Sequence, residues 1–284
     1  VHGYQVTATL FPAAGLGTQA SILVHVQKQA DNWQANSADS IATKPINQVL
    51  LFGSHDSGAY AINHDSFITA DASSDLIHIA SYVGFHPYIE GWSKTQNYNI
   101  YDQLILGIRY LDLRLCGARF EGLPTDSEQN IYLCHKLSAE TMKSVIDQVS
   151  KFLNQETHKQ EIVLLDMNHL YSVSESQMEI ITNYLQEKFG DKIASARNFK
   201  PTSTYQDFWT ANKQVIIFLD GEEIVNKYPD MYWSQETIES PWPNSTNVND
   251  LMTKMENNLQ ARNTEKFFVL QSQETPNSDE IGRA

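Results

Sequence analysis

Short apolar runs recur along most of the chain and constrain its fold more than any other feature. They lie at residues 49–53 (VLLFG), 106–116 (LGIRYLDLRLC), 131–135 (IYLCH), 161–169 (EIVLLDMNH), 214–220 (QVIIFLD) and 266–271 (KFFVLQ). Their length and composition are typical of strands, and helical patterns separate them. Because strands that alternate with helices favour parallel pairing, the sequence predicts an α/β fold, namely a (β/α) barrel or a close variant.

Two of the intervening segments carry helix signals. Ser138 is a candidate cap for a helix with one apolar face, and Ser174 with Gln177 resembles a capping box before a second helix. The apolar face of the first helix consists of Met142, Val145, Ile146, Val149, Phe152 and Leu153. We expect these faces to pack against the sheet.

The first 45 residues differ from the rest of the chain. Residues 4–10 (YQVTATL) and 21–27 (SILVHVQ) flank the turn-rich AAGLG and predict a hairpin, whereas the polar stretch 29–43 has the composition of a linker. We therefore predict a β-rich segment and linker at residues 1–45 and a barrel at residues 46–284.

Composition narrows the range of partners. The 284 residues are 41% hydrophobic, which is enough to fill a sizeable core. Thirty-four acidic and twenty basic residues give a net charge of −14, which argues against nucleic acid as a partner. No apolar run approaches the roughly 18 residues of a membrane span, so we expect any membrane contact to be peripheral. The cellular compartment stays open.

The chain has two cysteines, Cys116 and Cys134, which lie on neighbouring predicted strands. A disulfide between them is compatible with that placement. Two buried free thiols are the favoured interpretation, because cysteine is among the most buried residue types.

Polar side chains gather where the predicted strands end. They are His55 and Asp56 after the first strand, Asp112 and Arg114 late in the second, His135 at the end of the third, and Asp166 and Asn168 late in the fourth. Since the carboxyl ends of parallel strands meet at one mouth of a barrel, we expect these groups to lie close together. His169 follows on the alternate face of the fourth strand and is interpreted as a packing residue.

Two histidines, an arginine and an aspartate suit transfer at a phosphodiester. Imidazole can both remove and donate a proton near neutral pH, and arginine offers a planar fork that matches phosphate oxygens. Each residue alone also has a structural interpretation: Asp112 and Arg114 could be a buried ion pair, and Asp56 could cap a turn. Their shared position at one end of successive strands favours catalysis.

Several motifs also resemble a known family. The stretches GSHDSGAY, WSKTQNYNIYDQLILGIRYLDLRL, YLCHKL, EIVLLDMNHLY, PWPNSTN and FFVLQSQETP are similar, in this order, to the X-domain of phosphatidylinositol-specific phospholipases C. The resemblance covers residues 46–276 and is nearest to the small X-domain-containing proteins and the bacterial enzymes. It implies a TIM-like barrel and cleavage of a phosphoinositide to a cyclic inositol phosphate and diacylglycerol.

The resemblance also implies roles for single residues. His55 would be the general base and His135 the general acid, with Asp56 paired to His135. Arg114 would stabilise the phosphate, and Asp112 would orient Arg114 or hold an inositol hydroxyl. The calcium-dependent branch of the family has Asn after the first His, and acidic residues at both positions that here read Asp112 and Arg114. Because Asp56 and Arg114 occupy these positions here, the resemblance implies a built-in cation, with no cofactor and no calcium. The expected partner is a phospholipid headgroup or a membrane surface.

The chain departs from the family pattern in two places. Lys136 replaces the Gly that follows the acid histidine, which adds a cation near the mouth or reflects a different turn. Family members also have a last strand whose aspartate holds the base histidine, and no such strand follows FFVLQSQETP. The resemblance thus implies a barrel incomplete at its carboxyl end, with Asp166 as the nearest candidate to hold His55. Lys136, Asp166 and Asn168 are accordingly expected at the substrate site, with Asp112.

Two alternatives remain open. One keeps the chemistry and changes the substrate to a glycerophosphodiester or another phospholipid. The other is a catalytically inactive lipid-binding or scaffold module. Lys136 and the missing strand favour the second, whereas His55, Asp56, Arg114 and His135 oppose it.

Overall fold

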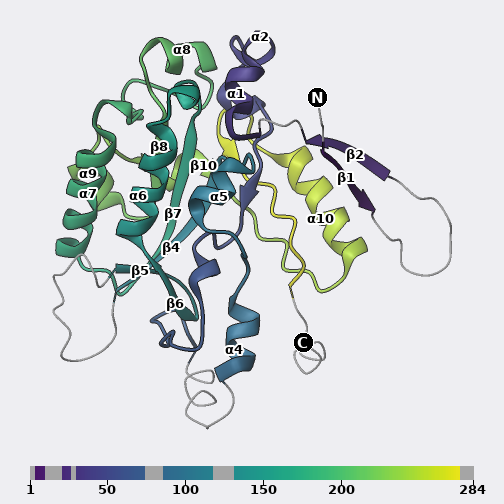
Figure 1. Ribbon diagram of the computed structural model, residues 1–284, viewed down its shortest axis with the longest axis vertical. Coiled ribbons are helices and arrows are strands. Elements are labelled where there is room, and N and C mark those ends of the chain that lie inside the picture. The colour runs from purple at the N-terminus through teal and green to yellow at the C-terminus, as the bar shows by residue number, and fades with distance from the viewer. Residues whose placement is uncertain (1–3, 10–20, 27–29, 74–85, 118–130, 276–284) are drawn as a thin grey trace.

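The computed structural model describes residues 4–9, 21–26, 30–73, 86–117 and 131–275 (Figure 1). Its centre is a mixed sheet of seven strands in the order β6-β5-β4-β7-β8-β9, with β3 on the same edge of β4 as β5. The strands are β3 (Gly53–Ser54), β4 (Tyr110–Gly117), β5 (Ile131–His135), β6 (Leu137–Thr141), β7 (Val163–Tyr171), β8 (Val215–Leu219) and β9 (Trp233–Ser234).

The direction of the strands follows the prediction except at one edge. β3, β4, β7, β8 and β9 pair in parallel. β4 and β5 pair antiparallel, as do β5 and β6, so the prediction of parallel pairing is wrong for residues 131–135. The physical reason is a tight turn: Lys136, at φ 65°, alone separates β5 from β6, and a hairpin needs no crossover helix.

Alternation along the strands separates two faces of the sheet. Leu111, Leu113 and Leu115 of β4 lie on the face that helices cover, together with Leu165 and Met167 of β7. On the opposite face Tyr110 and Leu164 are buried at the start of β4 and β7, in one apolar cluster with Ile216, Phe218, Trp233 and Phe267. Along the same face Asp112, Arg114 and Asp166 follow toward the carboxyl ends. In β4 and β7 this face thus changes from apolar to polar toward the carboxyl end.

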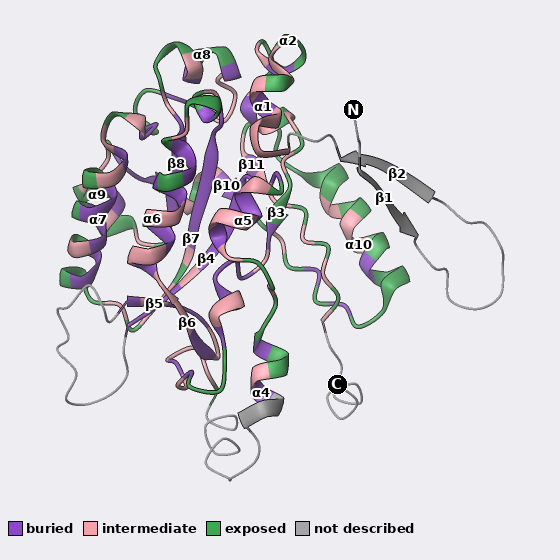
Figure 2. Ribbon diagram, in the orientation of Figure 1, coloured by how far each residue is buried: buried purple, intermediate pink, exposed green. Residues whose placement is uncertain are grey.

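Helices complete the layer outside the sheet, and α6, α7 and α9 lie together on one side of it, opposite α10 (Figure 1). The helices are α1 (Trp33–Asn36), α2 (Ala38–Ile41), α4 (His86–Ser93), α5 (Ile100–Ile105), α6 (Met142–Leu153), α7 (Glu175–Phe189), α8 (Tyr205–Thr210), α9 (Glu222–Lys227) and α10 (Val248–Ala261). Figure 2 shows β7 and β8 largely buried, whereas α10 is largely exposed. None of the helices described has the length and apolar character required to span a bilayer.

The helix signals in the sequence are confirmed in part. The predicted apolar face of α6 is fully buried, and Ser174 and Gln177 form the expected capping box of α7. Thr141, rather than Ser138, caps α6 through a hydrogen bond from the backbone N–H of Ser144 to its hydroxyl. Ser138 lies within β6, because the chain first completes the hairpin with β5.

The first residues form the predicted hairpin, in which β1 (Tyr4–Thr9) pairs antiparallel with β2 (Ser21–Val26). The interpretation of residues 29–43 as a linker is wrong, because α1 and α2 pack against the remainder of the chain. Trp33 Nε1 donates to the carbonyl of Gly107 at 3.1 Å, and the buried Gln34 bonds both backbone groups of Ile162. The proposed boundary near residue 45 stays a prediction.

The predicted first and last strands are shorter than their apolar runs. Residues 49–53 contribute only β3, and residues 266–271 contribute β11 (Phe267–Phe268), which pairs in parallel with β10 (Ile238–Glu239). Within the part of the chain that the structure describes, no strand pairs β3 with β11. A groove of about 920 Å³ lies between residues 46–55 and 259–273, and the sheet is open there.

Candidate active site

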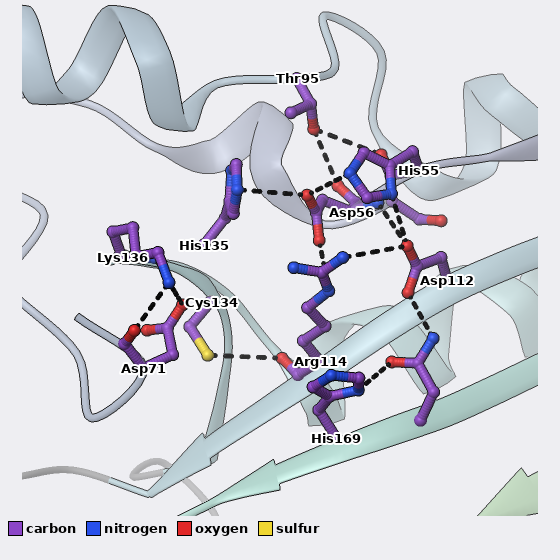
Figure 3. A network of polar contacts seen from close by, with 12 residues as sticks. His55, Asp56, Asp71, Thr95, Asp112, Arg114, Cys134, His135, Lys136 and His169 are labelled. Atoms are coloured by element: carbon purple, nitrogen blue, oxygen red, sulfur yellow. Dashed lines mark hydrogen bonds and ion pairs between the residues drawn. The ribbon is translucent and has the colours of Figure 1, made fainter. Parts of the chain in front are cut away.

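Five polar side chains converge at the carboxyl ends of β3, β4 and β5 (Figure 3). His55 Nε2 lies 3.0 Å from Asp56 Oδ2, and His135 Nε2 lies 3.6 Å from the same oxygen. Arg114 Nε lies 2.9 Å from Asp56 Oδ1. The side chains of His55, Arg114 and His135 are each 21% exposed, whereas that of Asp56 is 2% exposed. Two imidazoles and a guanidinium therefore share one buried carboxylate at a solvent-accessible mouth.

His55 is held by Asp112. The Nδ1 atom of His55 lies 2.8 Å from Asp112 Oδ2, which also accepts the backbone N–H of Asp56 at 3.1 Å. Burial raises the pKa of Asp112, but the hydrogen bond from His55 and the charge of Arg114 outweigh burial and lower this pKa to about 2. Asp112 is thus ionised at neutral pH and can accept an N–H from Nδ1 of His55, whose Nε2 is then directed toward Asp56.

Asp56 owes its position to an unusual backbone conformation. Its φ of 45° lies in the left-handed region, which Asp tolerates better than most residues. Neighbouring side chains of an extended strand point to opposite faces, but this reversal brings the side chains of His55 and Asp56 into contact. Burial raises the pKa of Asp56, and the charges of His135 and Arg114 oppose that rise.

His135 reaches the site from the opposite direction to the other strand ends. Because β5 runs antiparallel to β4, the chain reaches His135, the last residue of β5, while it runs in the direction opposite to β4. The backbone carbonyl of Ser93, at the end of α4, lies 3.0 Å from His135 Nδ1. An N–H donated by Nδ1 to this carbonyl would leave Nε2 directed toward Asp56.

Cys116 and Cys134 form a disulfide across β4 and β5, with a Cα–Cα distance of 6.0 Å. The interpretation of these residues as free thiols is therefore wrong. That interpretation rests only on the tendency of cysteine to be buried. The antiparallel register sets Leu115 opposite Leu133, so the two cysteines lie diagonally across the ladder. The bond fixes β5 against β4 immediately beside Arg114 and His135.

Asp166 does not hold His55, so this part of the prediction is wrong. Its carboxylate accepts hydrogen bonds from Tyr110 and Gln235, the latter at 2.5 Å. Burial raises the pKa of Asp166 to about 6, against the lowering effect of these hydrogen bonds. Asp112 lies nearer to His55 because β3 pairs directly with β4, whereas β7 lies one strand further away.

Asn168, His169 and Lys136 lie around this centre. Asn168 Nδ2 donates to Asp112 Oδ1 at 2.7 Å. His169 is exposed, so its interpretation as a packing residue is wrong; a register shift in β7 disturbs the regular alternation. Lys136 is turned to Asp71, with Nζ donating to the Asp71 carbonyl at 2.7 Å. A substrate role for Lys136 would require this contact to break.

Sequence reasoning missed Trp242 as a neighbour of His55. The two rings are stacked, with centroids 5.8 Å apart and an angle of 24° between their planes. The motif PWPNSTN contains this tryptophan and was a signal that could have found it. Of the two residues that hold Asp166, Tyr110 also lies in a quoted motif, WSKTQNYNIYDQLILGIRYLDLRL, whereas Gln235 lies in none.

Two groups among the described residues have ligand atoms close enough together for a metal ion. One consists of His55, Asp56 and Asp112, and the other of Asp71 with the two cysteines. The cysteines are joined in the disulfide and cannot act as thiolates. In the first group the Arg114 cation already lies against Asp56.

Comparisons with known proteins give the family of this chain. The family model described as "Phosphatidylinositol-specific phospholipase C, X domain" matches residues 77–219, which include Asp112, Arg114 and His135. Human PI-PLC X domain-containing protein 2 is 31% identical over 253 residues, covering 89% of this chain and 80% of the relative. Variant-surface-glycoprotein phospholipase C of Trypanosoma brucei brucei is 26% identical over 280 residues, covering 91% and 74%.

Solved structures agree on the fold. A mutant phosphatidylinositol-specific phospholipase C from Staphylococcus aureus has a TM-score of 0.58 at 14% identity, covering 89% of this chain and 81% of that chain. The enzyme from Listeria monocytogenes has a TM-score of 0.54 at 15% identity, covering 88% and 81%. The predicted TIM-like α/β fold is confirmed, with the sheet open within the described residues. The chain therefore belongs to the X-domain family of phosphatidylinositol-specific phospholipases C.

Proposed function

We propose that this protein is a phosphodiesterase of the phosphatidylinositol-specific phospholipase C type that cleaves a phosphoinositide without a metal ion. The observation that carries the proposal is the convergence of His55, His135 and Arg114 on the carboxylate of Asp56. Two proton-transfer groups on either side of a fixed cation suit a reaction in which negative charge develops on phosphorus.

His55 is the proposed general base. Asp112 holds its Nδ1–H, so Nε2 is the nitrogen that accepts the proton of the inositol 2-hydroxyl. The hydroxyl oxygen then attacks phosphorus and forms the cyclic phosphate. The ionised Asp112 stabilises the imidazolium that this step creates.

His135 is the proposed general acid. Its Nε2 proton passes to the glycerol oxygen as the bond from phosphorus to that oxygen breaks, which releases diacylglycerol. Asp56 Oδ2, 3.6 Å from His135 Nε2, orients this nitrogen before the transfer, and Arg114 binds the non-bridging phosphate oxygens. Arg114 supplies the positive charge that a metal ion would otherwise provide, which is the physical ground for proposing metal-independent chemistry.

The proposal is tested by incubating the protein with phosphatidylinositol vesicles in excess chelator and measuring the cyclic inositol phosphate. We expect product in chelator, no increase when calcium is restored, and loss of product in His55→Ala and His135→Ala. His64→Ala is a matched control, because His64 lies at the surface with a side chain 83% exposed.

The outcomes separate the alternatives. Activity that requires a divalent cation would contradict the metal-independent mechanism. Cleavage of a glycerophosphodiester in preference to phosphatidylinositol would change the substrate class. A silent wild type that still binds the vesicles would favour the non-catalytic lipid-binding module.

A further inference from the structure

Strand β7 contains one residue more than its partner over the length of the site. Asp112 of β4 lies opposite Asp166, and Arg114 lies opposite His169. One residue lies between Asp112 and Arg114 in β4, whereas two lie between Asp166 and His169 in β7. The register therefore shifts between these pairs. Such a bulge releases a residue from regular pairing and redirects its side chain. Asn168 lies in this interruption of the ladder.

The side-chain amide of Asn168 links two parts of the site. Its Nδ2 donates to Asp112 Oδ1 at 2.7 Å and lies 3.4 Å from Asp166 Oδ2. Its Oδ1 lies 3.1 Å from His169 Nδ1. Asp112 Oδ2 faces His55 (Figure 3). Contacts therefore run without interruption from His169 through Asn168 and Asp112 to His55.

We propose that Asn168 is a positioning residue that holds Asp112 against His55, and that His169 fixes the orientation of the Asn168 amide. The inference rests on the proposed function, since it concerns the base of that reaction. It replaces the substrate-binding role that the sequence predicted for Asn168.

A neutral amide with two N–H donors fits this position better than the alternatives. Asp112 and Asp166 lie opposite each other on paired strands and are 4% and 1% exposed. A third carboxylate there would repel both, whereas a cation would compete with His55 for Asp112. An Asn168 amide rotated by half a turn would direct its oxygen at Asp112, and an N–H from His169 opposes that rotation.

Kinetics of Asn168→Ala distinguish the two roles of Asn168. If Asn168 acts through Asp112, kcat falls about 10- to 100-fold, the value of one hydrogen bond to a charged group, while KM stays unchanged. Asn168→Asp should lose more, because it places a carboxylate against Asp112. His169→Ala should lose about threefold, and His169→Gln, which keeps an N–H donor, should recover part of that loss. A raised KM with unchanged kcat would overturn the proposal and restore a substrate contact.

A double-mutant cycle tests whether Asn168 acts through Asp112. In the Asp112→Asn background we expect Asn168→Ala to cause little further loss, because the acceptor it positions has already changed. Fully additive losses in the double variant would contradict the proposal.

A measurement without substrate separates this inference from the proposed function. In protein labelled with ¹⁵N-histidine, the Nδ1 proton of His55 is identified by its absence from His55→Ala. We expect this resonance to shift or disappear in Asn168→Ala and to persist in His64→Ala. An unchanged resonance in Asn168→Ala would overturn the positioning role, even if the wild type proved inactive. A silent wild type with a shifted resonance would overturn only the proposed function.

Discussion

The two ends of the barrel strands use the same kinds of side chain for different purposes. At the amino ends of β4 and β7, Arg109 and Glu161 form an ion pair with both side chains 0% exposed. His158 is also buried there and lies 3.1 Å from Asp31. At the carboxyl ends an arginine, two histidines and the carboxylates form the candidate site. The types of residue therefore do not decide which of the two clusters is the candidate active site.

The clusters differ in how completely their hydrogen bonds are satisfied. Arg109 donates to Glu161 and to the backbone carbonyls of Leu104, Ile108 and Asp31, so its fork is fully occupied. At the other end, His55, His135 and Arg114 compete for the single carboxylate of Asp56 and remain partly exposed. A network in which every donor has an acceptor stabilises the fold. A network in which three groups share one carboxylate and remain accessible can exchange one of these contacts for a contact with substrate.

The largest expected effect separates chemistry from stability at the carboxyl end. His55→Ala and His135→Ala should each lower the rate of phosphatidylinositol cleavage by about 10²- to 10⁴-fold, the usual contribution of a general base or acid. The free energy of unfolding should change little, because both side chains are partly exposed. Product assays and urea titrations of the same samples measure the two quantities. A large loss of stability in either variant would mean that the two ends are not distinct.

The reverse result is expected at the amino end. Glu161→Gln should lower the free energy of unfolding by about 3–5 kcal/mol, because it leaves the Arg109 charge buried without a counter-charge. Activity per folded molecule should be retained. The control is Asp230→Asn, which removes an exposed partner of Arg197 and should change stability by less than about 1 kcal/mol. Equal effects of the two variants in urea titrations would contradict the distinction between a closed and an exposed pair.

Removing the disulfide tests whether the carboxyl-end site also depends on a covalent link between β4 and β5. Replacing Cys116 and Cys134 together by Ala opens a loop with a sequence separation of 18 and should destabilise the protein by about 3 kcal/mol. The rate should also fall, since the bond joins the strands that carry Arg114 and His135. Thermal unfolding with and without a reductant measures the first effect. A reductant that changes the wild type but leaves the double variant unaffected would attribute the loss to this bond.

The smallest expected effect concerns the pH dependence of stability and depends on Asp166. Its pKa is raised to about 6 in the folded state from 3.8, so the native protein keeps a proton that the unfolded chain has released. The contribution of Asp166 to stability is therefore fully present below pH 3.8, is lost as pH rises through about 6, and totals up to about 3 kcal/mol. Asp166→Asn should remove this fall. Urea titrations from pH 4 to 7 measure the slope, and parallel curves for the two proteins would contradict the raised pKa.

Much of the carboxyl-end cluster could be predicted because strand ends are visible in sequence. His55 and Asp56 follow an apolar run, Asp112, Arg114 and His135 lie late in two others, and the structure brings them together. Their roles in catalysis stay proposals.

The remaining features depend on pairing, which a single sequence does not display. The antiparallel pairing of β5 with β4 brings Cys116 and Cys134 close enough for the disulfide. The register shift in β7 accompanies the exposure of His169. Both arise from contacts between strands that lie apart in the sequence. The buried Arg109 and Glu161 were likewise unremarkable until the sheet set them side by side.

The left-handed backbone at Asp56 has a consequence for how this site could evolve. Few residues other than Gly, Asn and Asp accept such a φ at little energetic cost, so most substitutions at position 56 would strain the turn before they altered any chemistry. Among these three, only Asp supplies a charge to a neighbouring histidine and arginine, and only Asn supplies a neutral oxygen ligand. The geometry of one turn thus limits descendants of this sequence to a short choice between an acid and an amide beside the proposed base.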